Sequence, residues 1–231
     1  MSRLFEELDY APTPIGAVSL RRRYEPKLNR DVLEVLLRDE HLMSDAFTAS
    51  EVALADLALA ALPDRPLSVA VGGLGLGYTA RAALADPRMR SLDVIEYLAP
   101  VIGWHENGLV PLGAELTGDP RCRFVQGDFF AMALGEGFGP PLDALLIDID
   151  HAPDRLLGPD AGFYAPEGLR AAARHLAPGG VLALWSDDAP DEAVTARLAA
   201  SIGKAAAYPV TFPNPYTGGI VTQTVYVAQS D

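Results

Sequence analysis

The sequence contains one cysteine and no long hydrophobic run, and each scarcity excludes a class of protein. Cys122 is the single cysteine among 231 residues, which excludes an internal disulfide and favours a reducing compartment. No apolar run approaches the roughly 20 residues of a membrane-spanning helix, and residues 1–7 lack the pattern of a secretory signal peptide. We therefore expect a cytoplasmic protein that does not enter a membrane.

Positive charge is also scarce, because 18 Lys and Arg stand against 31 Asp and Glu, for a formal net charge of −13. Nonspecific nucleic-acid binding requires basic surface that displaces counterions, so we expect no nucleic-acid partner. A cationic small molecule would suit such a chain, although acidity that serves solubility alone is the commoner explanation. The hydrophobic content of 49% is that of an ordinary globular protein with ample core.

A glycine-rich turn between a strand and a helix is the central feature of the chain. The apolar strand Leu67–Val71 leads into Gly72, Gly73, Gly75 and Gly77, which leave bare backbone for a ligand. The helix that follows directs free N–H groups and a partial positive charge at this turn. Strand, turn and helix form the first third of a nucleotide-binding βαβ unit, although glycines also serve packing alone in tight βα turns.

Acidic residues follow the next two apolar strands. Glu96 ends one strand about 20 residues beyond the last glycine, where a carboxylate can accept both hydroxyls of a ribose. Gly127 and Asp128 follow the next strand, where an acid can accept a hydrogen bond from an adenine amino group. The Gly-x-Gly-x-Gly spacing is one residue tighter than the dinucleotide fingerprint. The three features together therefore indicate the adenosine site of an S-adenosylmethionine-dependent enzyme.

The order of strands and helices predicts the fold class α/β. Regular alternation implies a parallel sheet with right-handed crossovers, and two final strands without a helix between them imply an antiparallel pair at its edge. We thus expect a Rossmann-like, seven-stranded S-adenosylmethionine-dependent methyltransferase fold over residues 48–231. Strands are expected at 67–71, 92–96, 122–126, 144–148, 181–185, 206–212 and 222–228, and helices at 50–62, 78–84, 99–107, 166–176 and 191–202.

Residues 1–47 differ from this alternating pattern. Ile15–Tyr24 and Asp31–Leu37 are typical strands around a turn, so we expect a small N-terminal β-hairpin region that serves as a lid or a dimer arm. Thr48-Ala-Ser-Glu51 has the pattern of a capping box, in which the Thr and Glu side chains bond to free backbone N–H groups. Glu51 is accordingly expected to be a capping residue.

Chemistry is expected where the fourth strand ends, because ligands of open α/β sheets bind outside the carboxyl ends of strands. Asp148 ends an otherwise apolar strand, where a carboxylate without a purpose would be costly to bury. It can take a proton from an attacking amine or hydroxyl and is the first candidate for a general base. Asp150 and His151 are further catalytic candidates, and a turn cap and a structural histidine are their ordinary alternatives.

A metal site is a second interpretation of these residues. Asp187 and Asp188 follow the fifth strand and could join Asp148, Asp150 and His151 as oxygen-rich ligands of a hard cation. The segment is also an ordinary N-terminal turn of a helix, where acids stabilise the helix dipole. We assign no metal ligand.

With these motifs the sequence resembles the spermidine synthase-like (polyamine aminopropyltransferase) family. The resemblance implies that Glu96 holds the ribose, Asp128 the adenine amino group, and Asp148 acts as the base. It also implies aminopropyl transfer from decarboxylated S-adenosylmethionine to putrescine by a homodimer. The matching segments extend from the N-terminal hairpin through 72–77, 96, 126–128, 147–148, 163–164 and 177–180 to 210–213.

Two departures from the family pattern leave the acceptor open. The family's glycine turn carries an aspartate that helps hold the aminopropyl amine, where this chain has Gly75. The family's second, amine-binding aspartate is here His151 or a shifted Asp150. A methyltransferase that uses S-adenosylmethionine on a small molecule is one alternative, since Ile147–His151 also resembles the strand end of such enzymes. A non-catalytic adenosine-nucleoside-binding protein is the other.

Overall fold

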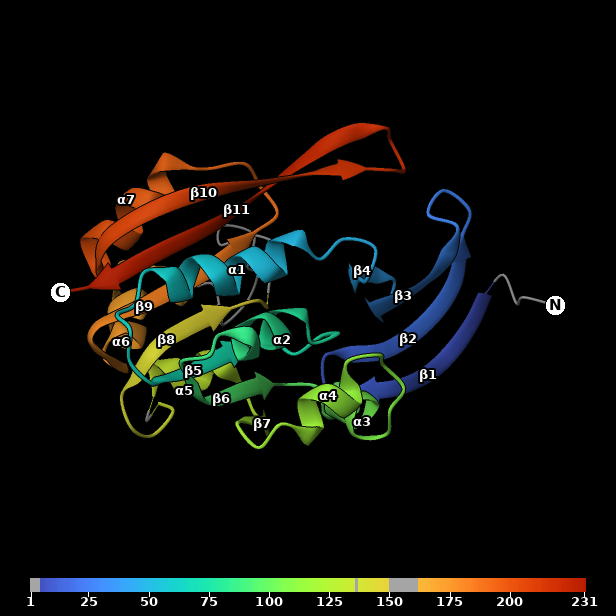
Figure 1. Ribbon diagram of the computed structural model, residues 1–231, viewed down its shortest axis with the longest axis horizontal. Coiled ribbons are helices and arrows are strands. Elements are labelled where there is room, and N and C mark those ends of the chain that lie inside the picture. The colour runs from blue at the N-terminus through green and yellow to red at the C-terminus, as the bar shows by residue number, and fades with distance from the viewer. Residues whose placement is uncertain (1–4, 136, 150–161) are drawn as a thin grey trace.

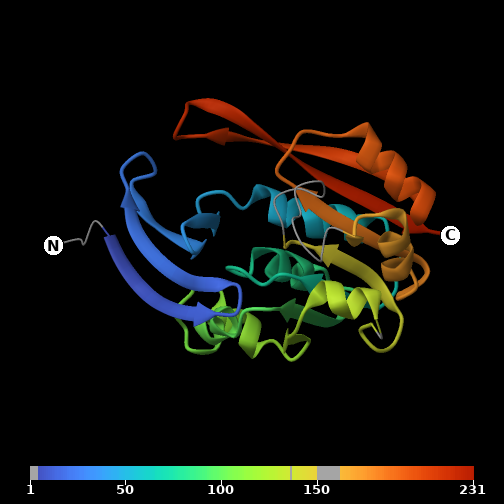
Figure 2. The same ribbon diagram turned by 180° about the vertical axis from the view of Figure 1, so that it is seen from behind.

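The computed structural model describes residues 5–135, 137–149 and 162–231. These residues form a four-stranded antiparallel sheet, followed by a seven-stranded mixed sheet with helices on both faces (Figures 1 and 2). Within the described ranges no helix is both long and apolar enough to cross a membrane.

The N-terminal sheet has the order β1-β2-β3-β4. The expected hairpin is β2 with β3, and the strands on either side of it were not predicted from the sequence. A register shift between Glu7 and Asp9 breaks the alternation of β1, and β4 is only five residues long, so neither gives a clear period of two. The bounds are β1 (Phe5–Thr13), β2 (Gly16–Glu25), β3 (Arg30–Leu37) and β4 (Glu40–Ser44).

The large sheet has the order β10-β11-β9-β8-β5-β6-β7, which confirms the expected seven-stranded fold. Strands β5 to β9 run parallel, while β11 pairs antiparallel with both β9 and β10. Every residue of β5 and β8 is buried, and these neighbours meet where the strand order reverses, the usual ligand-binding edge. The bounds are β5 (Leu67–Gly72), β6 (Met89–Glu96), β7 (Cys122–Gln126), β8 (Leu142–Ile147), β9 (Leu176–Ser186), β10 (Gly203–Asn214) and β11 (Gly219–Ser230).

The helices divide between two hydrophobic clusters. One cluster contains side chains from α1, α2 and α3, and the other contains side chains from α5, α6 and α7. Helices α4 and α5 were not predicted from the sequence, because six residues give less than two helical turns of periodicity. The bounds are α1 (Ala49–Ala60), α2 (Tyr78–Ala85), α3 (Ala99–Glu106), α4 (Gly113–Gly118), α5 (Phe129–Leu134), α6 (Pro166–Ala173) and α7 (Glu192–Ser201).

The N-terminal sheet lies beyond the carboxyl ends of the parallel strands (Figure 1). It is tied to α3 by the Trp104 indole, whose Nε1 donates a 2.6 Å hydrogen bond to Oδ2 of Asp9 in β1. On another side, the turn between β10 and β11 reaches the sheet, where Lys27 Nζ donates to the carbonyl of Tyr216. The edge where β5 and β8 end is thus enclosed by β4 and the β10–β11 arm.

Candidate functional site

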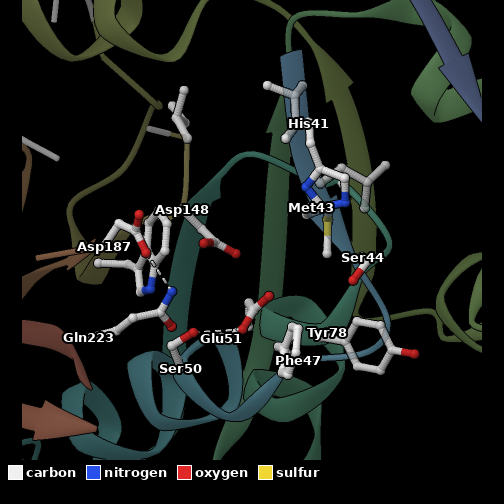
Figure 3. Close-up of a pocket in the computed structure, with 15 residues that line it drawn as sticks. His41, Met43, Ser44, Phe47, Ser50, Glu51, Tyr78, Asp148, Asp187 and Gln223 are labelled. Carbon is white, nitrogen blue, oxygen red and sulfur yellow. Dashed lines mark hydrogen bonds between the residues drawn. The ribbon is translucent and has the colours of Figure 1, made fainter. Parts of the chain in front are cut away.

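A cavity of about 260 Å³ lies at this enclosed edge (Figure 3). Its walls come from β4 and the loop after it, the first turns of α1 and α2, the glycine turn, the ends of β8 and β9, and Gln223 of β11. Of the predicted site residues that the structure describes, Gly75 and Asp148 line the cavity. Asp150 and His151 lie outside the described residues.

Asp148 lies where the sequence analysis expected it. Its backbone N–H donates to the carbonyl of Gly72, and its side chain is half-buried at the cavity. The Thr79 hydroxyl donates a 2.6 Å hydrogen bond to Asp148 Oδ2. Burial raises the pKa of Asp148 to about 6, against the opposing effect of this hydrogen bond. A carboxyl group that titrates near neutrality can act as a general base.

Glu51 faces the same cavity, and the capping box predicted for it is wrong. Thr48 is the N-cap of α1 but makes no side-chain capping bond, and the Glu51 carboxylate instead accepts a 2.8 Å hydrogen bond from Ser50 Oγ. Figure 3 shows the Glu51 and Asp148 carboxylates directed at the same space. Burial and the charge of Asp148 raise the pKa of Glu51 to about 7. The sequence did not reveal this residue, because a glutamate three positions after a threonine fits the local role of a helix cap.

The glycine turn is packed tightly against the rest of the protein. Gly73, Gly75 and Gly77 have φ angles of 92°, 47° and 92°, in the region that disfavours other residues. A Cβ atom would overlap the Phe129 ring at Gly72, the Asp148 carbonyl at Gly73, the Met43 sulfur at Gly75 and the Leu116 side chain at Gly77. These internal contacts therefore account for glycine at the four positions, whether or not the turn also contacts a ligand.

Glu96 holds the glycine turn in place. The residue is 8% exposed, and its two carboxylate oxygens accept hydrogen bonds from the N–H groups of Leu74 (2.9 Å) and Leu98 (2.8 Å), with further backbone N–H groups directed at them. Burial raises the pKa of Glu96, and the backbone hydrogen bonds oppose that shift. His105 supports the same turn, with Nε2 2.9 Å from the carbonyl of Gly75.

Gly127 and Asp128 lie at the same sheet edge, outside the lining of the cavity. The Gly127 N–H donates to the Glu96 carbonyl at 3.0 Å. Asp128 is the N-cap of α5, and its Oδ1 accepts a 2.9 Å hydrogen bond from the N–H of Ala131. The predicted ribose and adenine residues thus occupy neighbouring strand ends, next to the cavity that contains Asp148.

Asp187 lines the far wall of the cavity, where it accepts a 2.9 Å hydrogen bond from Gln223 Nε2. In the part of the chain that the structure describes, no three His, Cys, Asp or Glu side chains gather in a group that could hold a metal ion.

In sequence, the chain is similar to a polyamine aminopropyltransferase and to putrescine N-methyltransferases, although no family model matches it. A polyamine aminopropyltransferase of Mycobacterium tuberculosis is 29% identical over 182 residues, which are 78% of this chain and 32% of the relative. Putrescine N-methyltransferase 4 of Nicotiana tabacum is 28% identical over 145 residues, 62% of this chain and 35% of the relative. The chain therefore spans about a third of the length of the curated relatives that it matches.

Comparison of structures covers nearly the whole chain. A spermidine synthase solved with the transition-state analogue AdoDATO superposes with a TM-score of 0.77 at 17% identity, over 97% of this chain and 74% of that one. Spermidine synthase from Thermotoga maritima gives a TM-score of 0.74 at 16% identity, over 97% and 72%. The chain has the fold of spermidine synthases, and its resemblance to the spermidine synthase-like family is confirmed.

Proposed function

We propose that the protein is a spermidine synthase-like transferase that moves an aminopropyl group from decarboxylated S-adenosylmethionine to an amine acceptor. The observation that carries this proposal is the half-buried Asp148 carboxylate, with its raised pKa, in a cavity against the glycine turn. The relatives support the proposal, since one is a polyamine aminopropyltransferase and another is a putrescine N-methyltransferase.

The described residues of the cavity fit a cationic donor. Glu51, Asp148 and Asp187 line it, and no Lys or Arg is among its described lining residues. Glu96 would hold the ribose, as the family resemblance implies, from the strand end where it contacts the glycine turn. Asp128 would meet the adenine amino group, and the bare backbone of the glycine turn would lie alongside. S-adenosylmethionine would fit the same nucleoside residues.

The bound donor supplies a carbon activated by a sulfonium leaving group. The chain supplies a base and its orientation, because an attacking amine nitrogen must lose a proton as the C–N bond forms and the C–S bond breaks. Asp148 takes this proton, and the Thr79 hydrogen bond fixes the direction of its carboxylate. Positioning of the two reactants provides much of the remaining rate.

The test is to incubate the protein with decarboxylated S-adenosylmethionine and a panel of amines, and to follow methylthioadenosine and the aminopropylated product by mass spectrometry. Asp148→Asn should lower kcat by about 10² to 10⁴ while leaving nucleoside affinity intact. Unchanged turnover in this variant would remove Asp148 from the base role. Size-exclusion chromatography with light scattering tests the homodimer that we also propose.

A methyltransferase is the second candidate, favoured by the glycine turn. Gly75 provides no carboxylate there, and the Met43 sulfur of β4 lies against it and accepts a 3.2 Å hydrogen bond from the N–H of Leu76. The putrescine N-methyltransferases among the relatives are consistent with methyl transfer. A methylated amine formed from S-adenosylmethionine, with no product from its decarboxylated form, would establish this candidate. Nucleoside binding without turnover on any acceptor would instead indicate a non-catalytic binding protein.

A further inference from the structure

The proposed function uses Asp148 and leaves a second carboxylate in the same cavity without a role. Glu51 belongs to the first turn of α1, where the Thr48 side chain makes no capping bond, and its carboxylate is directed toward Asp148 (Figure 3). Its hydrogen bond with Ser50 involves one of its two oxygens. The Glu51 side chain is therefore available to a ligand in the cavity.

The surroundings of Glu51 make its position unfavourable in the absence of a cation. Asp148 faces it from the end of β8, and Asp187 lines the cavity from the end of β9. The other titratable groups of the described lining are His41 of β4 and Tyr78 of α2, neither of which is a permanent cation. Carboxylates that face the same cavity repel each other when they are ionised. Unfavourable repulsion of this kind is expected at functional sites, where a bound ligand of opposite charge relieves it.

We infer that Glu51 binds an ammonium group in this cavity, beside the base Asp148. The inference rests on the proposed function and specifies the ligand chemistry of its site. An ammonium group provides three donors and one positive charge, which satisfy both carboxylates at once. A ligand that presents a carboxylate at the same place would meet repulsion from Glu51 and Asp148. The ammonium group belongs either to the tail of the decarboxylated donor or to the amine acceptor.

Calorimetric titration of wild type and Glu51→Gln distinguishes these two sources. The donor arm compares decarboxylated S-adenosylmethionine with methylthioadenosine, which lacks both the aminopropyl tail and the sulfonium charge. The acceptor arm measures putrescine binding to protein saturated with methylthioadenosine. Glu106→Gln, at the exposed end of α3, is the control that removes the same charge outside the cavity.

Glu51→Gln should weaken at least one ammonium ligand by tenfold or more, since hydrogen bonds to charged groups are the strong ones. Methylthioadenosine affinity should change less than twofold, and Glu106→Gln should alter neither arm. Equal losses for all ligands, or no loss in either arm, would overturn the inference. So would a wild-type protein that binds neither ammonium ligand.

The failure of the proposed function gives a different pattern. A wild-type protein that binds an ammonium ligand through Glu51, yet forms no aminopropylated product, would refute aminopropyl transfer and leave the role of Glu51 standing. Aminopropyl transfer with ligand affinities insensitive to Glu51→Gln would do the reverse.

Discussion

Thr79 Oγ1 donates a 2.6 Å hydrogen bond to Asp148 Oδ2, and this bond joins the first turn of α2 to the end of β8. The same hydroxyl oxygen lies 3.3 Å from the carbonyl oxygen of Glu51, so the Thr79 side chain of α2 contacts both α1 and the residue that follows β8. Because the hydroxyl donates to the carboxylate, it favours the ionised form of Asp148 and opposes the effect of burial.

Thr79→Val should therefore raise the pKa of Asp148 further and displace the acidic limb of the kcat/KM profile to higher pH. The rate at pH 7 should fall roughly tenfold, the order expected for losing a hydrogen bond to a charged group. Thr79→Ser keeps the hydroxyl and should restore both the limb and the rate. The measurement is a pH–rate profile of the three proteins. A slower Thr79→Val enzyme with an unmoved limb would show that Thr79 only supports packing.

Glu51→Gln should make the protein without ligand more stable at alkaline pH. The pKa of Glu51 is raised from 4.5 to about 7 on folding, so the folded state binds more protons than the unfolded state between these values. The free energy of unfolding of the wild type therefore decreases as pH rises through this window. A neutral Gln removes the repulsion with Asp148 and should add about 1–2 kcal/mol at pH 8, less than the full shift implies for a partly exposed group.

Thermal unfolding at two pH values checks this prediction. The Tm of Glu51→Gln should exceed that of the wild type on the order of 2–8 °C at pH 8, and the two should converge near pH 4, where both carboxyl groups are protonated. Glu106→Gln should follow the wild type at both pH values. A Glu51→Gln protein that is less stable than the wild type at pH 8 would show that the carboxylate is stabilised by contacts other than those described.

The sequence predicted the large sheet well, because its signals are strong and local. Residues of β5 and β8 are apolar at nearly every position, as buried parallel strands require, and Asp148 stands out at the end of such a run. The glycine turn and Glu96 were recognised by spacing alone. Their hydrogen bonds to each other were not, since spacing gives the strand end but not the direction of a side chain.

The wrong prediction for Glu51 shows why the remaining contacts of the site could not be predicted from the sequence. A capping box and an acid that faces a cavity have the same local sequence, and only the position of β8 relative to α1 distinguishes them. The contact of Met43 with Gly75 likewise joins two segments that are 32 residues apart in sequence, since 75 − 43 = 32. Strand β4 has no pattern that reveals this contact.

Gly73→Ala should disturb the site much more than alanine at a free glycine with a similar backbone. Gly73 has φ 92° and its Cβ would overlap the carbonyl oxygen of Asp148, whereas Gly108 has φ 69° with no atom within 4 Å of a built Cβ. Gly108→Ala should cost about 1–2 kcal/mol, the ordinary cost of a left-handed conformation. Gly73→Ala should cost at least about 2 kcal/mol more, and it should displace Asp148 and abolish turnover. Urea unfolding and activity measure the two effects, and equal losses in both variants would contradict the close packing of Gly73 against Asp148.

Trp104→Phe should loosen the N-terminal sheet while leaving the cavity formed. The variant removes the donor to Asp9, a hydrogen bond to a charged group worth about 1.5–3 kcal/mol, and keeps most of the buried ring. Strand β1 should then detach more often, because this bond ties it to α3, so proteolysis between residues 5 and 25 should accelerate.

Asp9→Asn keeps an acceptor and should give a smaller effect. Methylthioadenosine affinity should persist in both variants, because β1 does not reach the described lining of the cavity. A lower stability with unchanged cleavage of β1 would show that Trp104 contributes to core packing without anchoring the sheet.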